Sequence, residues 1–206
     1  MTRAAVFDLF ETLVDYDEQK SLEFSTAAAE LLGRPVEQFH PLWRAGRPAR
    51  DSGPLRPYLA SIGIEGDPAD RLVELRRASS LGLLETPRPG VLETLADLRS
   101  RGIGLGLITV CSEDVVDVWD RTPFAGQFDS VVYSCSCGYR KPDPRLYMRV
   151  CEELRVAPAE ALYVGDGTND ELAGAEAVGM RAVQIGSTQP WDGERIAAIP
   201  EVLALL

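Results

Sequence analysis

The sequence predicts an α/β fold, a doubly wound, Rossmann-like parallel sheet with an inserted helical cap domain. Short segments that are apolar throughout alternate with stretches of helical periodicity, and this alternation is typical of a parallel sheet covered by helices on both faces. The alternation stops between residues 16 and 85, where helical periodicity continues without a convincing strand. A chain of 206 residues is long enough for one domain with a modest insertion.

Five apolar segments predict the strands, in chain order: Ala4–Phe7, Ile103–Thr109, Val131–Tyr133, Ala161–Val164 and Arg181–Ile185. Helices are predicted where apolar residues recur three or four positions apart, at Val91–Leu98, Leu146–Leu154 and Leu172–Val178. Each of these helices lies between two strands of the series or follows one directly. The order of elements therefore indicates a parallel sheet with helical crossovers.

The insertion is predicted to fold as a helical cap domain spanning residues 15–87, on a core domain of residues 1–14 and 88–206. Its apolar pattern and its prolines favour four helices, at Leu22–Leu32, Val36–Trp43, Leu55–Ile62 and Leu72–Leu83. The chain crosses between the two domains near Val14-Asp15 and near Pro87-Arg88-Pro89-Gly90. Double crossings of this kind act as hinges where a cap opens and closes over a site.

Composition and charge restrict the classes of partner. The chain has 21 Lys and Arg against 32 Asp and Glu, a net charge of −11 that repels phosphate backbones and anionic membranes. No apolar segment approaches the ~20 residues of a membrane span, and Asp8 lies where a signal peptide would continue its apolar stretch. We therefore expect a cytoplasmic protein that binds a small molecule and has neither a nucleic-acid nor a membrane partner.

Cysteine and histidine usage narrows the chemistry further. The four cysteines form no Cys-x-x-Cys pair and the only histidine, His40, is far from them, so a zinc site is disfavoured. A single histidine in a proline-flanked stretch also disfavours Ser-His-Asp or Cys-His catalysis. The cysteines are expected to be reduced thiols. Any reaction must then depend on carboxylates, lysine or a metal ion.

Polar residues follow the predicted strands where parallel sheets bind ligands, at the carboxyl ends. Asp8, Thr109 and Lys141 follow three strands, and the acidic segment Asp166–Glu171 follows another. Crowded carboxylates repel by roughly 4 kcal/mol per close pair at an effective dielectric of 20, which favours a bound Mg²⁺. The metal and Lys141 would neutralise a phosphoryl group, Thr109 would bond its oxygens, and Asp8 would attack it in line.

The four segments together resemble the haloacid dehalogenase-like hydrolase superfamily over the whole chain. The matching motifs, in order, are Asp8-x-x-x-Thr12-Leu13, the apolar run ending in Thr109, Arg140-Lys141-Pro142-Asp143-Pro144, and Gly165-Asp166-Gly167-x-x-Asp170. The resemblance implies Asp8 as nucleophile, with Mg²⁺ held by Asp8, the Phe10 carbonyl, Asp166 and a second acid. Asp170 is assigned that second position, although the adjacent Glu171 leaves the choice between them open.

Two departures from the family pattern keep alternatives open. The family's phosphatases carry a general acid two residues after the nucleophile, where this chain has Phe10, and usually a glycine next, where it has Glu11. The aromatic residue at position 10 is similar to the residue that the metal-free 2-haloacid dehalogenases carry at this position. Arg44 in Leu42-Trp43-Arg44 resembles the substrate-binding arginine of those enzymes. We expect a Mg²⁺-dependent phosphatase-like hydrolase acting on a small phosphorylated metabolite. The alternatives are a dehalogenase-type hydrolase and a non-catalytic binding protein on the same fold.

Overall fold

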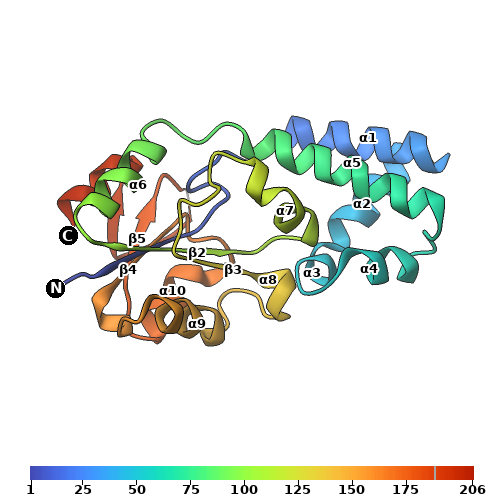
Figure 1. Cartoon of the computed structure of the whole chain (residues 1–206). Coiled ribbons are helices and arrows are strands. Elements are labelled where there is room, and N and C mark those ends of the chain that lie inside the picture. The colour runs from blue at the N-terminus through green and yellow to red at the C-terminus, as the bar shows by residue number, and fades with distance from the viewer. Residues whose placement is uncertain (188) are drawn as a thin grey trace.

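Six parallel strands form the central sheet of the computed structural model, which describes residues 1–187 and 189–206 (Figure 1). The strands lie in the order β3-β2-β1-β4-β5-β6. Their bounds are Ala4–Phe7 (β1), Gly104–Thr109 (β2), Ser130–Tyr133 (β3), Ala161–Gly165 (β4), Arg181–Ile185 (β5) and Glu194–Ile196 (β6). Strand order reverses beside β1, because the chain runs outward through β2 and β3 and then returns to β4. The predicted parallel α/β fold is confirmed.

Helices cover both faces of this sheet, as the uninterrupted apolar strands require. One face packs against α6 (Val91–Ser100), α7 (Glu113–Val118) and the 3₁₀ helix η4 (Ile199–Ala204). The other face packs against α9 (Pro144–Leu154) and α10 (Glu171–Ala177). Side chains of a strand point alternately to the two faces, so Ala5 and Phe7 of β1 join the first core while Ala4 and Val6 join the second.

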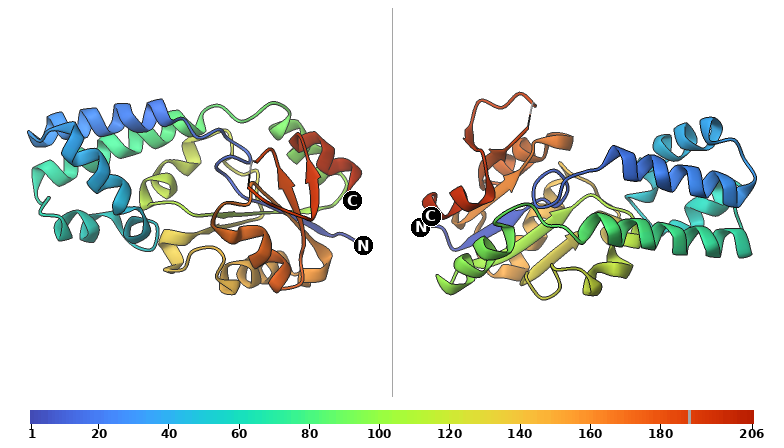
Figure 2. Two further views of the ribbon diagram at one scale, coloured as in Figure 1. Left: turned by 180° about the vertical axis from the view of Figure 1, so that it is seen from behind. Right: turned by 90° about the horizontal axis from the view of Figure 1, so that it is seen from above.

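Between β1 and α6 lies a separate group of helices with an apolar core of its own. These helices are α1 (Glu18–Leu32), α2 (Val36–Ala45), α3 (Arg47–Arg50), α4 (Leu55–Ser61) and α5 (Asp67–Leu84). Phe24, Phe39 and Trp43 are central to its core, and Trp43 lies within 6 Å, centroid to centroid, of both phenylalanine rings (5.1 and 5.7 Å). The group lies beyond the carboxyl ends of the strands, at the opposite end of the molecule from both termini (Figures 1 and 2). Residues 16–85, all described, contain no strand.

Arg88 connects the two crossings between this helical region and the sheet. Its backbone N–H donates to the Leu13 carbonyl at 2.8 Å, and its Nε contacts Asp15 Oδ1 at 2.6 Å. Its Nη2 contacts Glu11 Oε2 at 3.2 Å, and its Nη1 donates to the Glu11 carbonyl. The outgoing and returning segments are therefore tied side by side by one guanidinium group. That residues 15–87 form an independently moving domain stays a prediction.

Every end of the predicted strands and long helices lies within five residues of its observed position, and the elements that the sequence does not predict are short. The sequence does not predict β6, α3, α7 or η4, nor the one-turn helices η1 (Trp119–Arg121), α8 (Ser134–Cys137), η2 (Pro158–Glu160) and η3 (Thr168–Asp170). Segments of three to six residues are too short to display a period, so the apolar pattern does not distinguish them from loops. Among the described helices, none combines the length and the apolar character needed to cross a membrane.

Candidate active site

The carboxyl ends of β1 and β4 bring two aspartates together. Phe7 of β1 pairs with Val164 of β4, and the Asp8 N–H donates to the Val164 carbonyl at 2.9 Å, which continues the ladder by one residue. Asp166 follows one residue beyond the end of β4. This edge, where the strand order reverses, is the place where open α/β sheets bind ligands.

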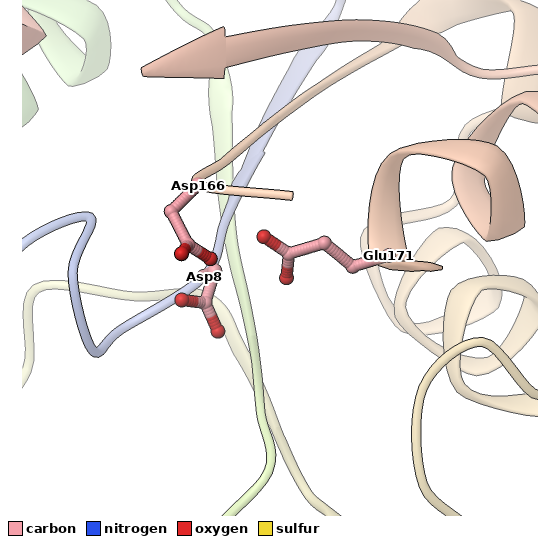
Figure 3. A group of neighbouring side chains, drawn as sticks. All are labelled: Asp8, Asp166 and Glu171. Carbon is pink, nitrogen blue, oxygen red and sulfur yellow. The ribbon is translucent and has the colours of Figure 1, made fainter. Parts of the chain in front are cut away.

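A third carboxylate reaches the same point from α10. Oxygen atoms of Asp8, Asp166 and Glu171 all lie within 4.8 Å of one another, and all three residues are buried. Figure 3 shows the Glu171 side chain extending from the start of its helix toward the two aspartates. Asp166 is oriented by Thr168, whose backbone N–H donates to one carboxylate oxygen at 3.0 Å and whose hydroxyl donates to the other at 2.5 Å.

Lys141 supplies the positive charge in this group. Its Nζ donates to Asp8 Oδ1 and, at 2.6 Å, to Glu171 Oε2, and its side chain is 1% exposed. Glu171 is held at both oxygens, because Tyr163 OH donates to Oε2 at 2.8 Å and the Gly167 N–H donates to Oε1 at 2.9 Å. The other oxygen of Asp8 accepts a weaker hydrogen bond from the Thr12 hydroxyl at 3.3 Å. The lysine thus bridges the nucleophile candidate and the helix carboxylate.

The charges in this group are unbalanced. Burial, opposed by Lys141, raises the pKa of Asp8, and burial together with the charge of Asp8 raises the pKa of Glu171 to about 7. For Lys141, burial lowers the pKa but the charges of Asp8 and Glu171 more than offset it, so that its pKa is raised. Three carboxylates therefore face one ammonium group in a space of low dielectric. Such a group gains free energy from a further positive charge.

The donor atoms of this group fit a hard divalent cation. All the candidate ligands are carboxylate oxygens, which Mg²⁺ prefers, and the described residues of the group include neither a thiol nor an imidazole. The fit is also supported by the burial of all three carboxylates, because buried carboxylates that lie this close to one another are stabilised by a cation between them.

Asp170 and Glu171, between which the sequence left the choice open, have different positions. Asp170 has a left-handed backbone conformation (φ 54°), is exposed, and lies outside the carboxylate group. Glu171 begins α10 and is 1% exposed within the group. The structure thus brings together Asp8, Asp166 and Lys141 of the predicted site residues and adds Glu171 to them.

Thr109 and Arg44 lie away from this group of charges. Thr109 ends β2 and is fully buried, and its hydroxyl oxygen has no hydrogen-bond partner among the described residues. The residues after it, Val110 and Cys111, line a cavity near the charged group, whereas Thr109 is absent from the lining of the two cavities described here. Arg44, on α2, lines a neighbouring cavity. The substrate-binding roles assigned to these two residues stay predictions.

A cavity of about 220 Å³, here the carboxylate cavity, opens above the charged group. Its lining includes Asp8, Lys141, Asp166 and Glu171, together with Phe10. Glu11 also lines this cavity, in a left-handed conformation (φ 62°), and its carboxylate accepts from the Tyr16 N–H at 2.5 Å as well as contacting Arg88. The Glu11 carboxylate is therefore engaged in holding the crossing segment.

Curated relatives of this chain include archaeal phosphatases. It is 31% identical over 198 residues to the glyceraldehyde 3-phosphate phosphatase of Methanothermobacter thermautotrophicus, covering 91% of this chain and 87% of that protein. A protein of the same name from Methanopyrus kandleri is 37% identical over 102 residues, which cover 48% of this chain and 43% of the relative. Several curated relatives are matched over less than half of their own length.

Solved structures share the fold as well. A 2-haloacid dehalogenase from Pseudomonas syringae pv. Tomato DC3000 superposes with a TM-score of 0.72 at 25% identity, covering 100% of this chain and 98% of that one. The family model of the haloacid dehalogenase-like hydrolases matches residues 2–179, which include both strand-end aspartates, Lys141 and Glu171. With this match, the chain belongs to the haloacid dehalogenase-like hydrolases.

Proposed function

We propose that this chain is a Mg²⁺-dependent phosphohydrolase that transfers a phosphoryl group from a small metabolite to Asp8. The observation that carries the proposal is the buried group of three carboxylates around Lys141 at the reversal of strand order. The phosphatases among the relatives that cover most of this chain support the same reaction class.

Asp8 acts as the nucleophile in this proposal. An Asp8 oxygen attacks the phosphorus atom in line, the bond to the leaving oxygen breaks, and an aspartyl phosphate forms on Asp8. Lys141 orients Asp8 through its hydrogen bond and balances negative charge on the phosphoryl oxygens. Water then attacks the aspartyl phosphate, which releases inorganic phosphate and regenerates the carboxylate.

Asp8, Asp166 and Glu171 would hold the Mg²⁺, with the Phe10 carbonyl as a further oxygen ligand. When bound, the ion supplies positive charge that stabilises the developing negative charge of phosphoryl transfer. We propose Glu171 in place of Asp170, because the Glu171 carboxylate is buried within reach of the other two and Asp170 is exposed.

We propose that Phe10 limits the rate of phosphoryl transfer, because it occupies the position of the general acid. Phe10 lines the carboxylate cavity two residues after the nucleophile, and its side chain has no group that can transfer a proton to or from the leaving oxygen. General acid–base assistance is typically worth ~10²–10⁴ in rate, so leaving groups that depart without a proton should react best.

The decisive experiment is a panel of phosphate monoesters and 2-haloacids, assayed with and without Mg²⁺. We expect Mg²⁺-dependent release of phosphate, and a phosphoryl adduct on the Asp8 peptide detected by mass spectrometry after rapid quenching. Asp8→Asn should abolish both, while Asp192→Asn, the same chemical change at an exposed position outside the cavity, should preserve both. Phosphatase activity that survives Asp8→Asn would overturn the proposal.

A dehalogenase-type hydrolase is the second candidate, favoured by the aromatic residue Phe10, which lines the carboxylate cavity at the position of the missing general acid. In that reaction Asp8 displaces halide from carbon, and no leaving oxygen requires a proton. Metal-independent halide release from the same panel, without phosphate release, would establish this function instead.

A further inference from the structure

A second cavity of about 240 Å³ adjoins the carboxylate cavity, between the helical region and the segment that follows β2. The two cavities share four lining residues: Phe10, Tyr16, Arg47 and Val110. A molecule with one end at Asp8 can therefore extend its other end past these shared residues into the second cavity.

Arginine side chains from three helices line this second cavity, here called the arginine cavity. They are Arg44 of α2, Arg47 and Arg50 of α3, and Arg76 of α5. Such a convergence is notable in a chain whose net charge is −11, because most of its surface repels anions. Guanidinium groups recognise carboxylate and phosphate with paired hydrogen bonds.

Arg50 is the most buried of these arginines, at 5% exposure. Its guanidinium lies 3.8 Å from the Trp43 ring centroid, and its Nη1 donates to the Trp43 carbonyl. Its Nε has no hydrogen-bond partner among the described residues. Burial, with a further contribution from the nearby charge of Arg76, lowers the pKa of Arg50. A buried donor without a partner favours an acceptor in the cavity.

The carboxylates around these arginines do not balance them. Asp51 contacts Arg47 at 3.3 Å, and the fully buried Asp114 lies 3.1 Å from Arg76 Nε without the geometry of a hydrogen bond. Arg44 has no ion pair within the described part of the chain, and Asp51 is the one acid that lines the cavity. Two carboxylates therefore neutralise only part of the charge of four guanidinium groups, and the cavity keeps a net positive charge.

The remaining walls of the arginine cavity are largely apolar. Trp43, Leu83 and Val115 line it, and Phe10 lines both this cavity and the carboxylate cavity. Carbon atoms that connect two anionic groups would lie against these side chains.

We propose that the arginine cavity binds a second anionic group of the substrate, a carboxylate or a second phosphate, while the phosphoryl group reacts at Asp8. The inference rests on the proposed function and names its substrate class: small phosphate monoesters with a further anion a few carbon atoms away. Arg50 and Arg76 provide the central contacts, and Arg44 and Arg47 contribute at the mouth.

Binding of a non-hydrolysable probe tests this anion site independently of turnover. The probe is 3-phosphonopropanoate, and its matched control is the neutral amide 3-phosphonopropanamide, which has nearly the same shape. By calorimetric titration in the presence of Mg²⁺, we expect the acid to bind at least ~10-fold more tightly than the amide, since charge-assisted hydrogen bonds are lost with the amide. Ethane-1,2-diyl bisphosphonate, tested in parallel, distinguishes a second phosphate from a carboxylate.

Arginine variants test whether the preference for the acid over the amide arises in the arginine cavity. Arg76→Gln should reduce the acid-to-amide ratio to about 1, and Arg44→Gln, at an exposed side chain without an ion pair, should reduce it several-fold without risk to folding. Arg71→Gln is the control, because Arg71 lies exposed on the same helix as Arg76 but outside the cavity. Thermal unfolding checks that each variant is folded.

Equal affinity for acid and amide in the wild-type protein, or absence of binding by either, overturns the inference. A preference that persists in both folded arginine variants overturns it as well. Acid-specific binding without turnover of any phosphate ester would support the anion site while contradicting the proposed phosphatase. Halide release from 2-chloropropanoate, without phosphate release from any ester, would move the reaction to the dehalogenase candidate and overturn the substrate class named here.

Discussion

Lys141 Nζ lies 2.6 Å from Glu171 Oε2, an ion pair whose two side chains are 1% and 2% exposed. Lys141 precedes α9 and Glu171 begins α10, and these two helices pack on the same face of the sheet. The pair links the predicted third and fourth motifs directly. The same ammonium group also contacts Asp8. One positive charge therefore faces three carboxylates, those of Asp8, Asp166 and Glu171.

Binding of Mg²⁺ should depend on Glu171 and not on its neighbour. Glu171→Gln removes a buried carboxylate from the group of three, so we expect Mg²⁺ affinity in calorimetric titrations to fall at least ~10-fold. Asp170→Asn is the matched control, because the exposed Asp170 lies outside that group. The opposite result, loss of affinity with Asp170→Asn alone, would return the second acid to Asp170. Absence of Mg²⁺ binding to the wild-type protein would remove the metal site.

Stability of the metal-free protein should fall as the pH rises. The pKa of Glu171 is raised from 4.5 to about 7, so the folded state binds a proton that the unfolded state has released between these values. Between about pH 5.5 and about pH 8, this loss should amount to about 2 kcal/mol of unfolding free energy.

Urea unfolding in the presence of a chelator measures this loss, with Glu171→Gln as the comparison. The variant cannot titrate at position 171 but keeps the other buried carboxyls. Over the same pH range, its unfolding free energy should therefore decline by about 2 kcal/mol less than that of the wild-type protein. Equal declines in the two proteins would show that Glu171 does not titrate in this range. Saturating Mg²⁺ should raise the stability most at high pH, where the carboxylates are deprotonated.

Phe10 should make the enzyme selective for leaving groups that need no proton. We expect activated aryl phosphates to be hydrolysed faster than alkyl phosphates, with the aspartyl phosphate accumulating, because general acid–base help worth ~10²–10⁴ is missing. Phe10→Asp should raise activity on alkyl phosphates, since the smaller carboxylate occupies the space of the ring. Phe10→Asn, of similar size but without an acid, should not.

Rapid alkyl phosphate hydrolysis by the wild-type protein, at ~10 s⁻¹, would contradict this account of Phe10. Glu11 would then be the first residue to test as the acid, by Glu11→Gln. Its carboxylate contacts Arg88 and the Tyr16 N–H, so such a role would require those contacts to open.

Residues 15–87 are proposed to move as one body about the two crossings. Arg88→Gln removes the side-chain contacts to Glu11 and Asp15, so hydrogen–deuterium exchange should accelerate in residues 11–16 and 86–90. Exchange within α1–α5 should remain unchanged, because that region has its own apolar core. Arg101→Gln, which removes a contact to the Leu203 carbonyl elsewhere in the core domain, is the control. Acceleration spread through α1–α5 would contradict movement as one body.

Sequence patterns were informative where one residue type repeats over a sufficient length. The runs Ala4–Phe7 and Ala161–Val164 are apolar at every position because both faces of the sheet are covered, and their strands appear where predicted. β6 and α3, of three and four residues, had no such signal. They exist because neighbouring elements support them, which local sequence does not encode.

The choice between Asp170 and Glu171 illustrates a second limit. Adjacent residues are equally close to the motif in sequence, but they point in different directions once the backbone turns. The left-handed conformations of Asn169 and Asp170 (φ 60° and 54°) direct the chain so that Glu171 begins the helix facing Lys141. A turn of this kind depends on backbone dihedrals, and its result could be known only in three dimensions.

By itself, the sequence determined the parallel sheet, the helical insertion, the family, and the residues Asp8, Lys141 and Asp166, because strand patterns and strand-end residues are local in the chain. The tertiary structure alone decided that Glu171 completes the carboxylate group and that arginines from three helices meet in one cavity beside it. Arg50 and Asp8 are distant in sequence, and their cavities adjoin only because the insertion packs over the strand ends. Such juxtapositions depend on how helices pack against one another, to which every residue of the core contributes and which no short motif records.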